Sequence, residues 1–279
     1  MKHYQIREMA TLLDISPSAL RNFEEKGLLF PHRTMSGGYR QFDPVDLNLL
    51  LRIRGFTRCG LSLEKTAELM HDMDIGRVAD ALEEQSDEIE REVQLLALKS
   101  SYMRHRAAQL RRAAAMTEPW VLTPSPAMYV LPFRTKEEIL NGGDSGNEIR
   151  RWSSLKPFTE SLVLVPRTSL ESGEIAFVYG TCIEKEYGDK LGISEGGSVR
   201  LMAAHETCAY MLSRVTTHRT EQLNQSEQAG RANLEKLLAS LAEAGYAPDG
   251  DAYGTTLHTQ VTSTAYQHVS EIWVPLRKI

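Results

Sequence analysis

The chain has 279 residues, of which 42% are hydrophobic, 25% charged and 7% aromatic, and its formal net charge is −5. This length and apolar content suffice for two folded domains, which excludes disorder as the dominant state. No segment approaches the roughly 18 apolar residues of a membrane span, and the N-terminus has no apolar signal-peptide core. Three scattered cysteines cannot form a disulfide framework or a metal site. We therefore expect a cytoplasmic protein without cofactor or metal.

Residues 1–75 are predicted to form a winged helix-turn-helix domain. Apolar residues at helical spacing predict a first helix that ends near Asp14, and Ser16-Pro17 predicts the cap and first turn of a second helix. A hairpin or wing follows over 28–42, and a third and a fourth helix continue to about residue 70.

The second helix carries polar side chains that are suited to DNA. Two short helices joined by a tight turn place the second helix in the major groove, where Ser18, Arg21 and Asn22 can contact phosphates and base edges. Residues 1–60 also carry nine Lys and Arg against six acidic residues, whereas residues 114–279 carry 15 basic and 20 acidic residues. On spacing alone, a small helical protein-binding module is the alternative.

The segment from residue 4 to residue 70 contains the motifs LRNFEEKGLL, GYR and GLSLE. In this order and spacing the motifs resemble those of the MerR family of bacterial transcription regulators. The resemblance implies double-stranded promoter DNA as the partner. The resemblance implies that Arg21, Tyr39 and Arg40 contact the DNA. This sequence departs from the family at Asn22-Phe23, which replaces a usual tyrosine pair, and at Gln41, which replaces a wing tyrosine. The predicted DNA-contacting residues are Ser16, Ser18, Arg21, Asn22, Phe23, Tyr39 and Arg40.

Residues 76–116 are predicted to form a long helix that dimerises as an antiparallel coiled coil. Apolar and small residues keep an alternating spacing of four and three, which is typical of a coiled-coil seam. The first half of the helix is acidic and the second half basic, so antiparallel pairing in a two-fold homodimer sets opposite charges side by side. Packing of the seam on its own chain is the alternative. The large seam residues are Leu82, Ile89, Val93, Leu96, Met103 and Leu110.

Residues 117–279 are predicted to form an α+β domain that duplicates a strand–helix–strand–strand unit. The first copy comprises a strand over 127–133, a helix over 135–154, and strands over 161–166 and 174–184. The second comprises strands over 199–204 and 207–215, a helix over 221–244, and strands over 251–259 and 268–276. Two copies placed back to back would leave a cleft between their helix-free faces, which is a natural small-molecule site.

This domain resembles the GyrI-like (SHS2-like) effector-binding domains, most visibly in EAGYAPDGDAYGTTL and VSEIWVPLRK. With the MerR-like head and the long helix, the resemblance implies the multidrug-sensing branch of the family. It implies an activator that binds a small hydrophobic effector and distorts the promoter so that RNA polymerase can engage. Those sensors carry a glutamate directly after the tyrosine of the penultimate strand. Here Gly254 follows Tyr253, so cation specificity does not carry over.

Alternation along the last strand selects candidate ligand-binding residues. Ile272, Val274 and Leu276 share one face, which we assign to the helices, so Glu271 and Trp273 are expected to face the cleft or solvent. An aromatic wall beside a carboxylate suits a flat or cationic ligand, and ordinary core packing or a salt bridge is the alternative. The predicted ligand-binding residues are Tyr129, Trp152, Phe158, Phe177, Tyr179, Tyr253, Glu271 and Trp273.

Three other functions remain open. A metal or redox sensor of the same family would need cysteines just after the long helix, where alanines and Met116 stand. A small-molecule hydrolase fused to the DNA-binding head could use Cys182 or Cys208 with a histidine, although no spacing identifies a catalytic pair. A ligand-independent architectural DNA binder is the third. We predict a ligand-responsive transcription regulator and not an enzyme.

Overall fold

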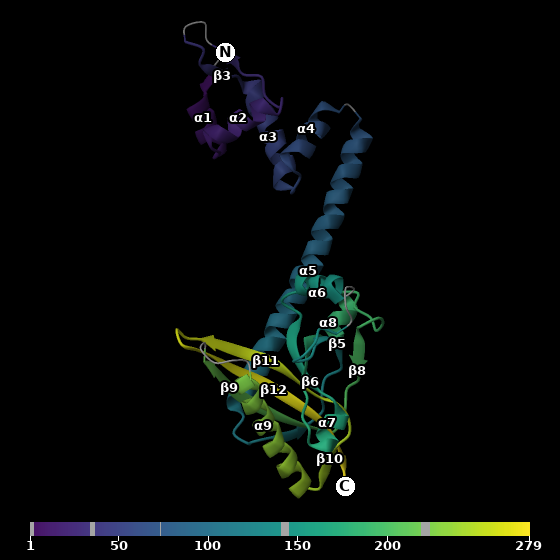
Figure 1. Ribbon diagram of the computed structural model, residues 1–279. Coiled ribbons are helices and arrows are strands. Elements are labelled where there is room, and N and C mark those ends of the chain that lie inside the picture. The colour runs from purple at the N-terminus through teal and green to yellow at the C-terminus, as the bar shows by residue number, and fades with distance from the viewer. Residues whose placement is uncertain (1–2, 34–36, 73, 141–144, 219–223) are drawn as a thin grey trace. The chain divides into compact units, whose positions relative to one another are not determined.

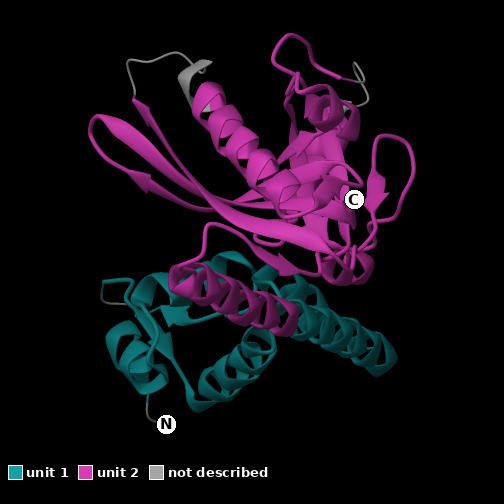
Figure 2. Ribbon diagram, turned by 90° about the horizontal axis from the view of Figure 1, so that it is seen from below, with its two compact units in different colours: residues 1–96 teal, residues 97–279 magenta. Residues whose placement is uncertain are grey.

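A computed structural model describes residues 3–33, 37–72, 74–140, 145–218 and 224–279 (Figure 1). The chain forms two compact units, residues 1–96 and 97–279, which Figure 2 colours separately. Helix α5, Ile75–Ala115, has 41 residues and contributes to both units. The domain boundaries placed after residues 75 and 116 stay a prediction. Within the described ranges, no helix has the length and apolar character to cross a membrane.

The first unit contains the predicted winged helix-turn-helix. Its helices before α5 are α1 (Ile6–Leu13), α2 (Pro17–Glu25), α3 (Pro44–Arg58) and α4 (Leu63–His71). A small sheet in the order β1-β3-β2 is formed by β1 (Tyr4–Gln5), β3 (Arg40–Phe42) and β2 (His32–Arg33). Buried residues of α1, α2 and α3, among them Met9, Leu20 and Leu50, meet in one core.

Local side-chain chemistry fixes where these helices begin and end. Ser16 Oγ accepts from the Ala19 amide at 3.1 Å, and Asp43 Oδ1 accepts from the Val45 amide at 2.7 Å. A proline follows each of these two caps in the first turn, where a missing amide hydrogen leaves no bond unmade. After α2, Gly27 has a φ of +70°, a conformation that glycine adopts without strain. The predicted end of the first helix near Asp14 and the predicted start of the second helix at Ser16-Pro17 are therefore confirmed.

Helix α5 exposes its predicted seam. The residues Leu82, Ile89, Val93, Leu96, Met103 and Leu110 have exposed fractions between 38% and 67% in the single chain. The alternative, in which this stripe packs on its own chain, does not agree with that exposure. A different face of the helix is covered within the second unit, where Tyr102 is buried in a cluster with residues such as Phe158 and Tyr187.

The second unit is built on one antiparallel sheet with the strand order β4-β9-β12-β11-β6-β7-β5-β8, and β10 pairs with β12. The strands are β4 (Val121–Thr123), β5 (Met128–Arg134), β6 (Glu160–Val165), β7 (Val178–Glu184), β8 (Arg200–Met202), β9 (Cys208–His218), β10 (Tyr246–Pro248), β11 (Ala252–Val261) and β12 (Ala265–Lys278). Besides the end of α5, the helices are α6 (Ser145–Ser154), α7 (Arg167–Ser172), α8 (Lys185–Lys190) and α9 (Asn224–Glu243).

The predicted duplication is visible in the strand order. One copy contributes β5-β7-β6, with α6 between β5 and β6 in the chain, and the other contributes β9-β12-β11, with α9 between β9 and β11. The two copies meet where β6 pairs with β11. The fold is therefore α+β, as predicted.

Several elements of the second unit differ from the prediction. The helix predicted over 135–154 is described only as α6, because Thr135 Oγ1 accepts from the amides of Glu137 and Glu138 and forms a turn instead. The strand predicted from residue 174 begins at Val178, and α7, α8, β4 and β10 were not predicted. The strand predicted over 199–204 in the second copy is β8, which pairs with β5 of the first copy instead. The start of the helix predicted from residue 221 lies outside the described residues.

The two faces of this sheet are covered differently. On one face, leucines of α9 such as Leu237 pack with Val274 and Leu276 of β12, as the alternation predicted. On the other face, Tyr253 and Trp273 form a cluster that Met116, just after α5, also touches. The sheet therefore separates α9 from the end of α5.

Candidate nucleic-acid interface and small-molecule pocket

Helix α2 and its N-cap residue present four of the predicted DNA-contacting residues to solvent. Ser16, Ser18, Arg21 and Asn22 are exposed, and the hydroxyls of the two serines form a hydrogen bond of 2.7 Å. Phe23 is only 9% exposed and lies in the core. Its place among the predicted contacts was wrong, because it stands three residues after buried Leu20 and shares that residue's face of the helix.

A carboxylate connects the hairpin to helix α2. Glu24 Oε2 accepts from Arg40 Nε at 2.5 Å, and Glu24 Oε1 accepts from Arg33 Nη2 at 3.2 Å. Arg40 therefore holds the hairpin against α2, and its guanidinium is already engaged by the protein. Tyr39 is 73% exposed on the same hairpin, at a position where it can meet a partner.

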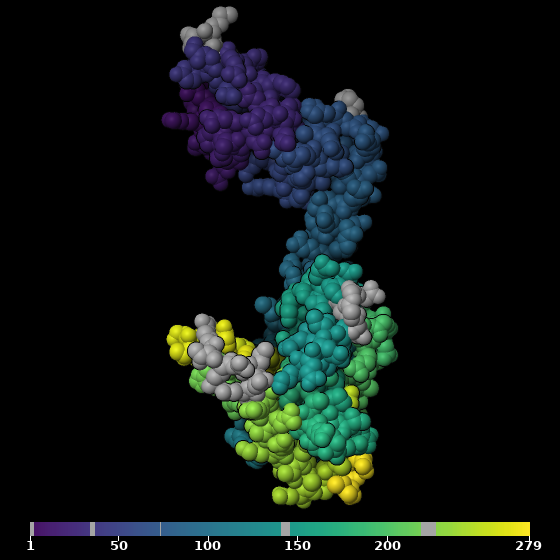
Figure 3. Space-filling view, in the orientation of Figure 1, coloured from purple at the N-terminus to yellow at the C-terminus, as the bar shows by residue number. Residues whose placement is uncertain are grey.

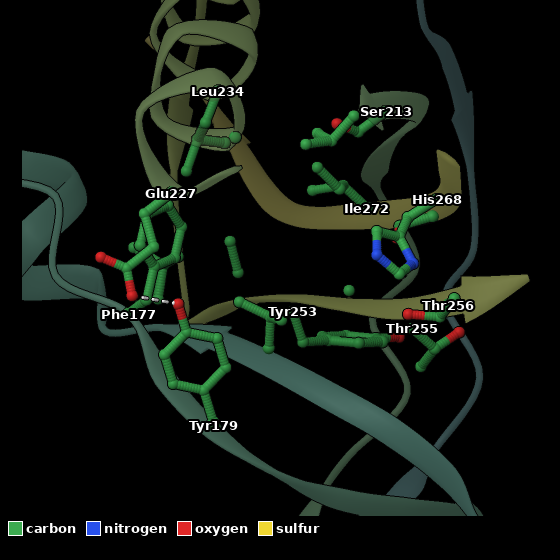
Figure 4. A pocket seen from close by; sticks show the side chains of 17 residues that line it. Phe177, Tyr179, Ser213, Glu227, Leu234, Tyr253, Thr255, Thr256, His268 and Ile272 are labelled. Carbon is green, nitrogen blue, oxygen red and sulfur yellow. Dashed lines mark hydrogen bonds between the residues drawn. The ribbon is translucent and has the colours of Figure 1, made fainter. Parts of the chain in front are cut away.

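A cavity of about 280 Å³ lies in the second unit, on the face of the sheet that carries α9 (Figure 4). Val163, Val165, Phe177, Leu234 and Ile272 are among its apolar lining residues. Figure 4 shows Tyr179 and Glu227 at one end, and Ser213, Thr256 and His268 at the other. The cavity thus has an apolar middle between two polar ends.

Three of the eight predicted ligand-binding residues, Phe177, Tyr179 and Tyr253, are among its lining residues, although the Tyr253 ring packs with Trp273 in the cluster on the opposite face of the sheet. The other five do not line this cavity, which lies under a helix and not on a helix-free face. They are buried elsewhere, and their part in ligand binding stays a prediction: Tyr129, Trp152, Phe158, Glu271 and Trp273. Ile272, which was assigned to helix packing, is on the cavity side.

Sequence reasoning missed the contribution of α9. Glu227, Gly230 and Leu234 stand at positions i, i+3 and i+7 of this helix and all line the cavity. A carboxylate and a glycine on the apolar stripe of a helix were the signal that could have located them. Gly254, singled out in the sequence for lacking a glutamate side chain, also lines the cavity.

Glu271 lies on the opposite face of the sheet and is 5% exposed. Its Oε1 accepts from Thr255 Oγ1 at 2.8 Å, whereas its Oε2 has no partner among the described residues. Burial raises the pKa of this carboxyl, and Glu184 adds to the rise, while the Thr255 hydrogen bond and the charges of Arg106 and Arg112 oppose it. The buried carboxyl therefore costs stability when it ionises.

This carboxyl should make unfolding depend on pH. Because the native pKa of Glu271 is raised, the native state holds the proton more tightly than the unfolded chain does. The stability contribution of the group is therefore present below its ordinary pKa and is lost as pH rises through the raised value. We expect Glu271→Gln, which keeps an acceptor for Thr255, to raise the melting temperature at about pH 8, where 1 kcal/mol corresponds to roughly 2–4 °C, and to raise it less near about pH 4. Glu235→Gln, exposed on α9, is the control and should follow the wild type. An equal gain at both pH values would contradict the assignment.

The two cysteines of the second unit are not placed as nucleophiles. Cys182 and Cys208 are fully buried, and burial raises the pKa of both thiols. Cys208 Sγ lies 3.8 Å from the backbone oxygen of His205, whose Nδ1 contacts the backbone of Thr207. Among the described residues, no group of three or more His, Cys, Asp or Glu could hold a metal ion.

The N-terminal region matches known regulatory proteins. Residues 4–73 match the family model of the MerR HTH family regulatory proteins. The HTH-type transcriptional regulator CueR of Escherichia coli O6:H1 is 33% identical over 66 residues, which are 24% of this chain and 49% of CueR. ZntR of Escherichia coli K12 is 31% identical over 67 residues, which are 24% of this chain and 48% of ZntR. The chain thus spans about half the length of these curated relatives.

A solved structure of a MerR-family transcriptional regulator from Bacillus cereus is 20% identical and has a TM-score of 0.36, over 56% of this chain and 99% of that one. The family assignment rests on the N-terminal match alone. There, the capped helices, the hairpin and the exposed face of α2 coincide with the matched residues. Residues 4–73 of this chain therefore form a helix-turn-helix domain that is similar to the MerR HTH family regulatory proteins.

Proposed function

We propose that the chain is a homodimeric DNA-binding transcription regulator whose second unit binds a small apolar or aromatic effector. The observation that carries this proposal is the MerR-family domain at residues 4–73, whose helix α2 exposes Ser18, Arg21 and Asn22. The proposed partners are double-stranded promoter DNA and RNA polymerase, with activation by distortion of the promoter. A cytoplasmic location and the absence of catalysis belong to the same proposal.

The exposed seam of α5 supports a homodimer. Six large apolar side chains on one stripe are between 38% and 67% exposed in the single chain, and burial of the rest of each would contribute about half of the roughly 1.5–3 kcal/mol of a complete side chain. The acidic first half and basic second half of α5 favour antiparallel pairing. A dimer also suits DNA reading, because two copies of α2 can contact two half-sites.

The cavity supports effector binding by the second unit. Its lining is mostly apolar, with a few polar groups at its two ends, which is the usual composition of a small-molecule site. The duplicated strand–helix–strand–strand order, in which the two copies meet at β6 and β11, supports a GyrI-like effector-binding domain.

Arg106 offers a route from the cavity to the dimer helix. This residue of α5 donates from Nη2 to the carbonyl oxygens of Thr256 and Leu257, at 2.7 and 3.1 Å. The pairing of β11 with β12 is irregular at this point, between Thr256 and His258, and Thr256 lines the cavity on the other side of the sheet. A ligand that shifts this bulge would therefore move the acceptors that hold α5.

Arg21→Ala tests the DNA-binding proposal. The probe is a double-stranded DNA that the full chain selects from a randomised pool. We expect the loss of a base or phosphate contact to lower the affinity of the chain for this DNA about tenfold or more. If the contact is to phosphate, the slope of log affinity against log salt concentration should also fall in magnitude by about one. Arg231→Ala, exposed on α9, is the matched control and should bind like the wild type.

Two results would overturn this proposal. The chain could fail to enrich any DNA from the pool at low salt, which would exclude a sequence-reading regulator. Alternatively, Arg21→Ala could bind the selected DNA with unchanged affinity at every salt concentration, and α2 would then not be the recognition helix.

A small-molecule hydrolase is the second candidate function, and one contact favours it. Tyr179 Oη donates to Glu227 Oε1 at 2.5 Å inside the cavity, which places a phenol and a carboxylate together. Incubating purified chain with compounds that bind the cavity, followed by mass spectrometry of the products, separates the two functions. Repeated turnover that Glu227→Gln abolishes would establish the hydrolase.

A further inference from the structure

Two walls of the cavity lack side chains. Gly254 lines it from strand β11 and Gly230 from helix α9. A Cβ at Gly254 would lie 2.8 Å from the carbonyl oxygen of Glu271, so close approach of the backbone requires glycine there. A Cβ at Gly230 would meet the Phe177 ring at 3.9 Å, an ordinary contact. Packing therefore does not require glycine at position 230. Glycine there costs the helix about 1 kcal/mol relative to alanine. Its effect is to leave space in the cavity.

The charges at one end of the cavity are already balanced. Glu227 accepts from the Tyr179 hydroxyl and lies 3.8 Å from Lys136 Nζ. The Arg134 guanidinium lies 4.3 Å from the centre of the Tyr179 ring. Burial, followed by the Glu227 hydrogen bond, raises the pKa of Tyr179, so its hydroxyl stays a donor. With two cations beside a single carboxylate, this end of the cavity offers no uncompensated negative charge to a cationic ligand.

The other end presents neutral hydrogen-bonding groups. Ser213, Thr256, His268 and Ser270 line it. Ser213 Oγ accepts from Asn233 Nδ2 at 2.9 Å, and His268 Nδ1 is 3.0 Å from Thr259 Oγ1, so the protein fixes the orientation of both side chains. A hydroxyl or carbonyl group on the ligand would find partners here, whereas a purely apolar edge would leave them unpaired.

The volume limits the size of the ligand. At about 280 Å³, the cavity is slightly smaller than the roughly 300–1,000 Å³ that is usual for small-molecule sites. The cavity is lined by Gly230 from helix α9 and by Gly254 from strand β11. We infer that it takes a small, flat, uncharged aromatic molecule with a hydroxyl or carbonyl group at one edge, and that Gly230 determines the thickness it admits. The inference rests on the proposed effector-binding role of this cavity.

Three probes on the same ring system test this inference by isothermal titration calorimetry of the full chain. Naphthol is flat, neutral and carries a hydroxyl, naphthalene lacks the hydroxyl, and the naphthyl trimethylammonium ion carries a fixed charge. We expect naphthol to bind about tenfold more tightly than either of the others, a difference of about 1.4 kcal/mol.

Matched glycine variants test the role of Gly230. Gly230→Leu should fill part of the cavity and weaken naphthol binding about tenfold or more. Gly230→Ala should weaken it less while raising the melting temperature, because alanine favours the helix. Gly146→Leu is the control, since Gly146 is an exposed glycine of helix α6 with open space around its Cβ position. Its affinity for naphthol should equal that of the wild type.

The outcomes separate this inference from the proposed function. Equal or tighter binding of the ammonium ion, no binding of naphthol, or unchanged affinity of a folded Gly230→Leu and Gly230→Ala would each overturn the inference. Binding of the selected DNA by the same samples is measured in parallel. Intact DNA binding with failed naphthol selectivity rejects only the ligand class, whereas naphthol selectivity without DNA binding rejects the regulator and supports the pocket assignment.

Discussion

Leu96→Asp is expected to convert the dimer into monomers and to weaken binding to the selected DNA by more than about a hundredfold. Leu96 is 54% exposed in the single chain and stands midway between the seam ends Leu82 and Leu110. In an antiparallel pair, the midpoint of one helix faces the midpoint of the other. The substitution therefore buries two carboxylates against each other without a partner, which costs several kcal/mol. Loss of the dimer also removes the second half-site contact.

Sedimentation equilibrium and DNA titration are the measurements for this variant. Gln94→Asp is the matched control, because it adds the same charge to an exposed position of α5 away from the seam. It should leave both the dimer and the DNA affinity close to wild type. A Leu96→Asp protein that remains dimeric would show that the seam lies elsewhere.

Single cysteines test the direction of pairing. In a Cys59→Ser background, which removes the exposed native thiol, Leu96→Cys should form an interchain disulfide under mild oxidation. Ile89→Cys should not, because antiparallel helices would hold the two introduced thiols about 21 Å apart at a rise of 1.5 Å per residue. Parallel helices would allow both disulfides, so cross-linking of Ile89→Cys would contradict the charge argument.

The elements that local chemistry determines were predictable from the sequence. Ser16 and Asp43 are side-chain acceptors followed by proline, and such a pair specifies a helix start whatever surrounds it. The long helix α5 was equally predictable, because the apolar spacing of its predicted seam repeats over many turns. Thr135 shows the limit of this reasoning, since its hydroxyl bonds two nearby amides and forms a turn where helix was predicted.

The cavity could be predicted only in part, because alternation assigns residues to two faces without saying which face holds free space. Phe177 and Tyr179 line the cavity, and their part in ligand binding stays a prediction. Glu271 is buried and does not line it, although carboxylates are rarely buried and a position facing a cleft or solvent was the natural expectation. The free space depends on Gly230 of α9, whose importance follows from what it packs against and not from its own sequence neighbourhood.

Arg106→Ala is expected to separate effector binding from the response to it. The guanidinium holds two carbonyl oxygens of β11 from α5, and Glu160 and Gln109 lie beside it at 3.6 and 3.2 Å. Loss of these bonds leaves the cavity lining and α2 unchanged, so we expect naphthol affinity and DNA affinity, each measured alone, to stay within about threefold of wild type. Coupling free energies between sites are typically 1–3 kcal/mol, so the response that disappears should be about 5- to 150-fold.

Reciprocity provides the measurement. If effector and DNA are coupled, naphthol affinity must change when the selected DNA is bound, and by the same factor as DNA affinity changes with naphthol. This factor should fall to about one in Arg106→Ala. Arg106→Lys should fall nearly as far, because an ammonium lacks the planar fork that spans several acceptors. Arg104→Ala, exposed on the same helix, should retain the coupling. Coupling that persists in Arg106→Ala would mean that the signal leaves the cavity through α9 or β12 instead, and the contact at the β11 bulge would then be structural alone.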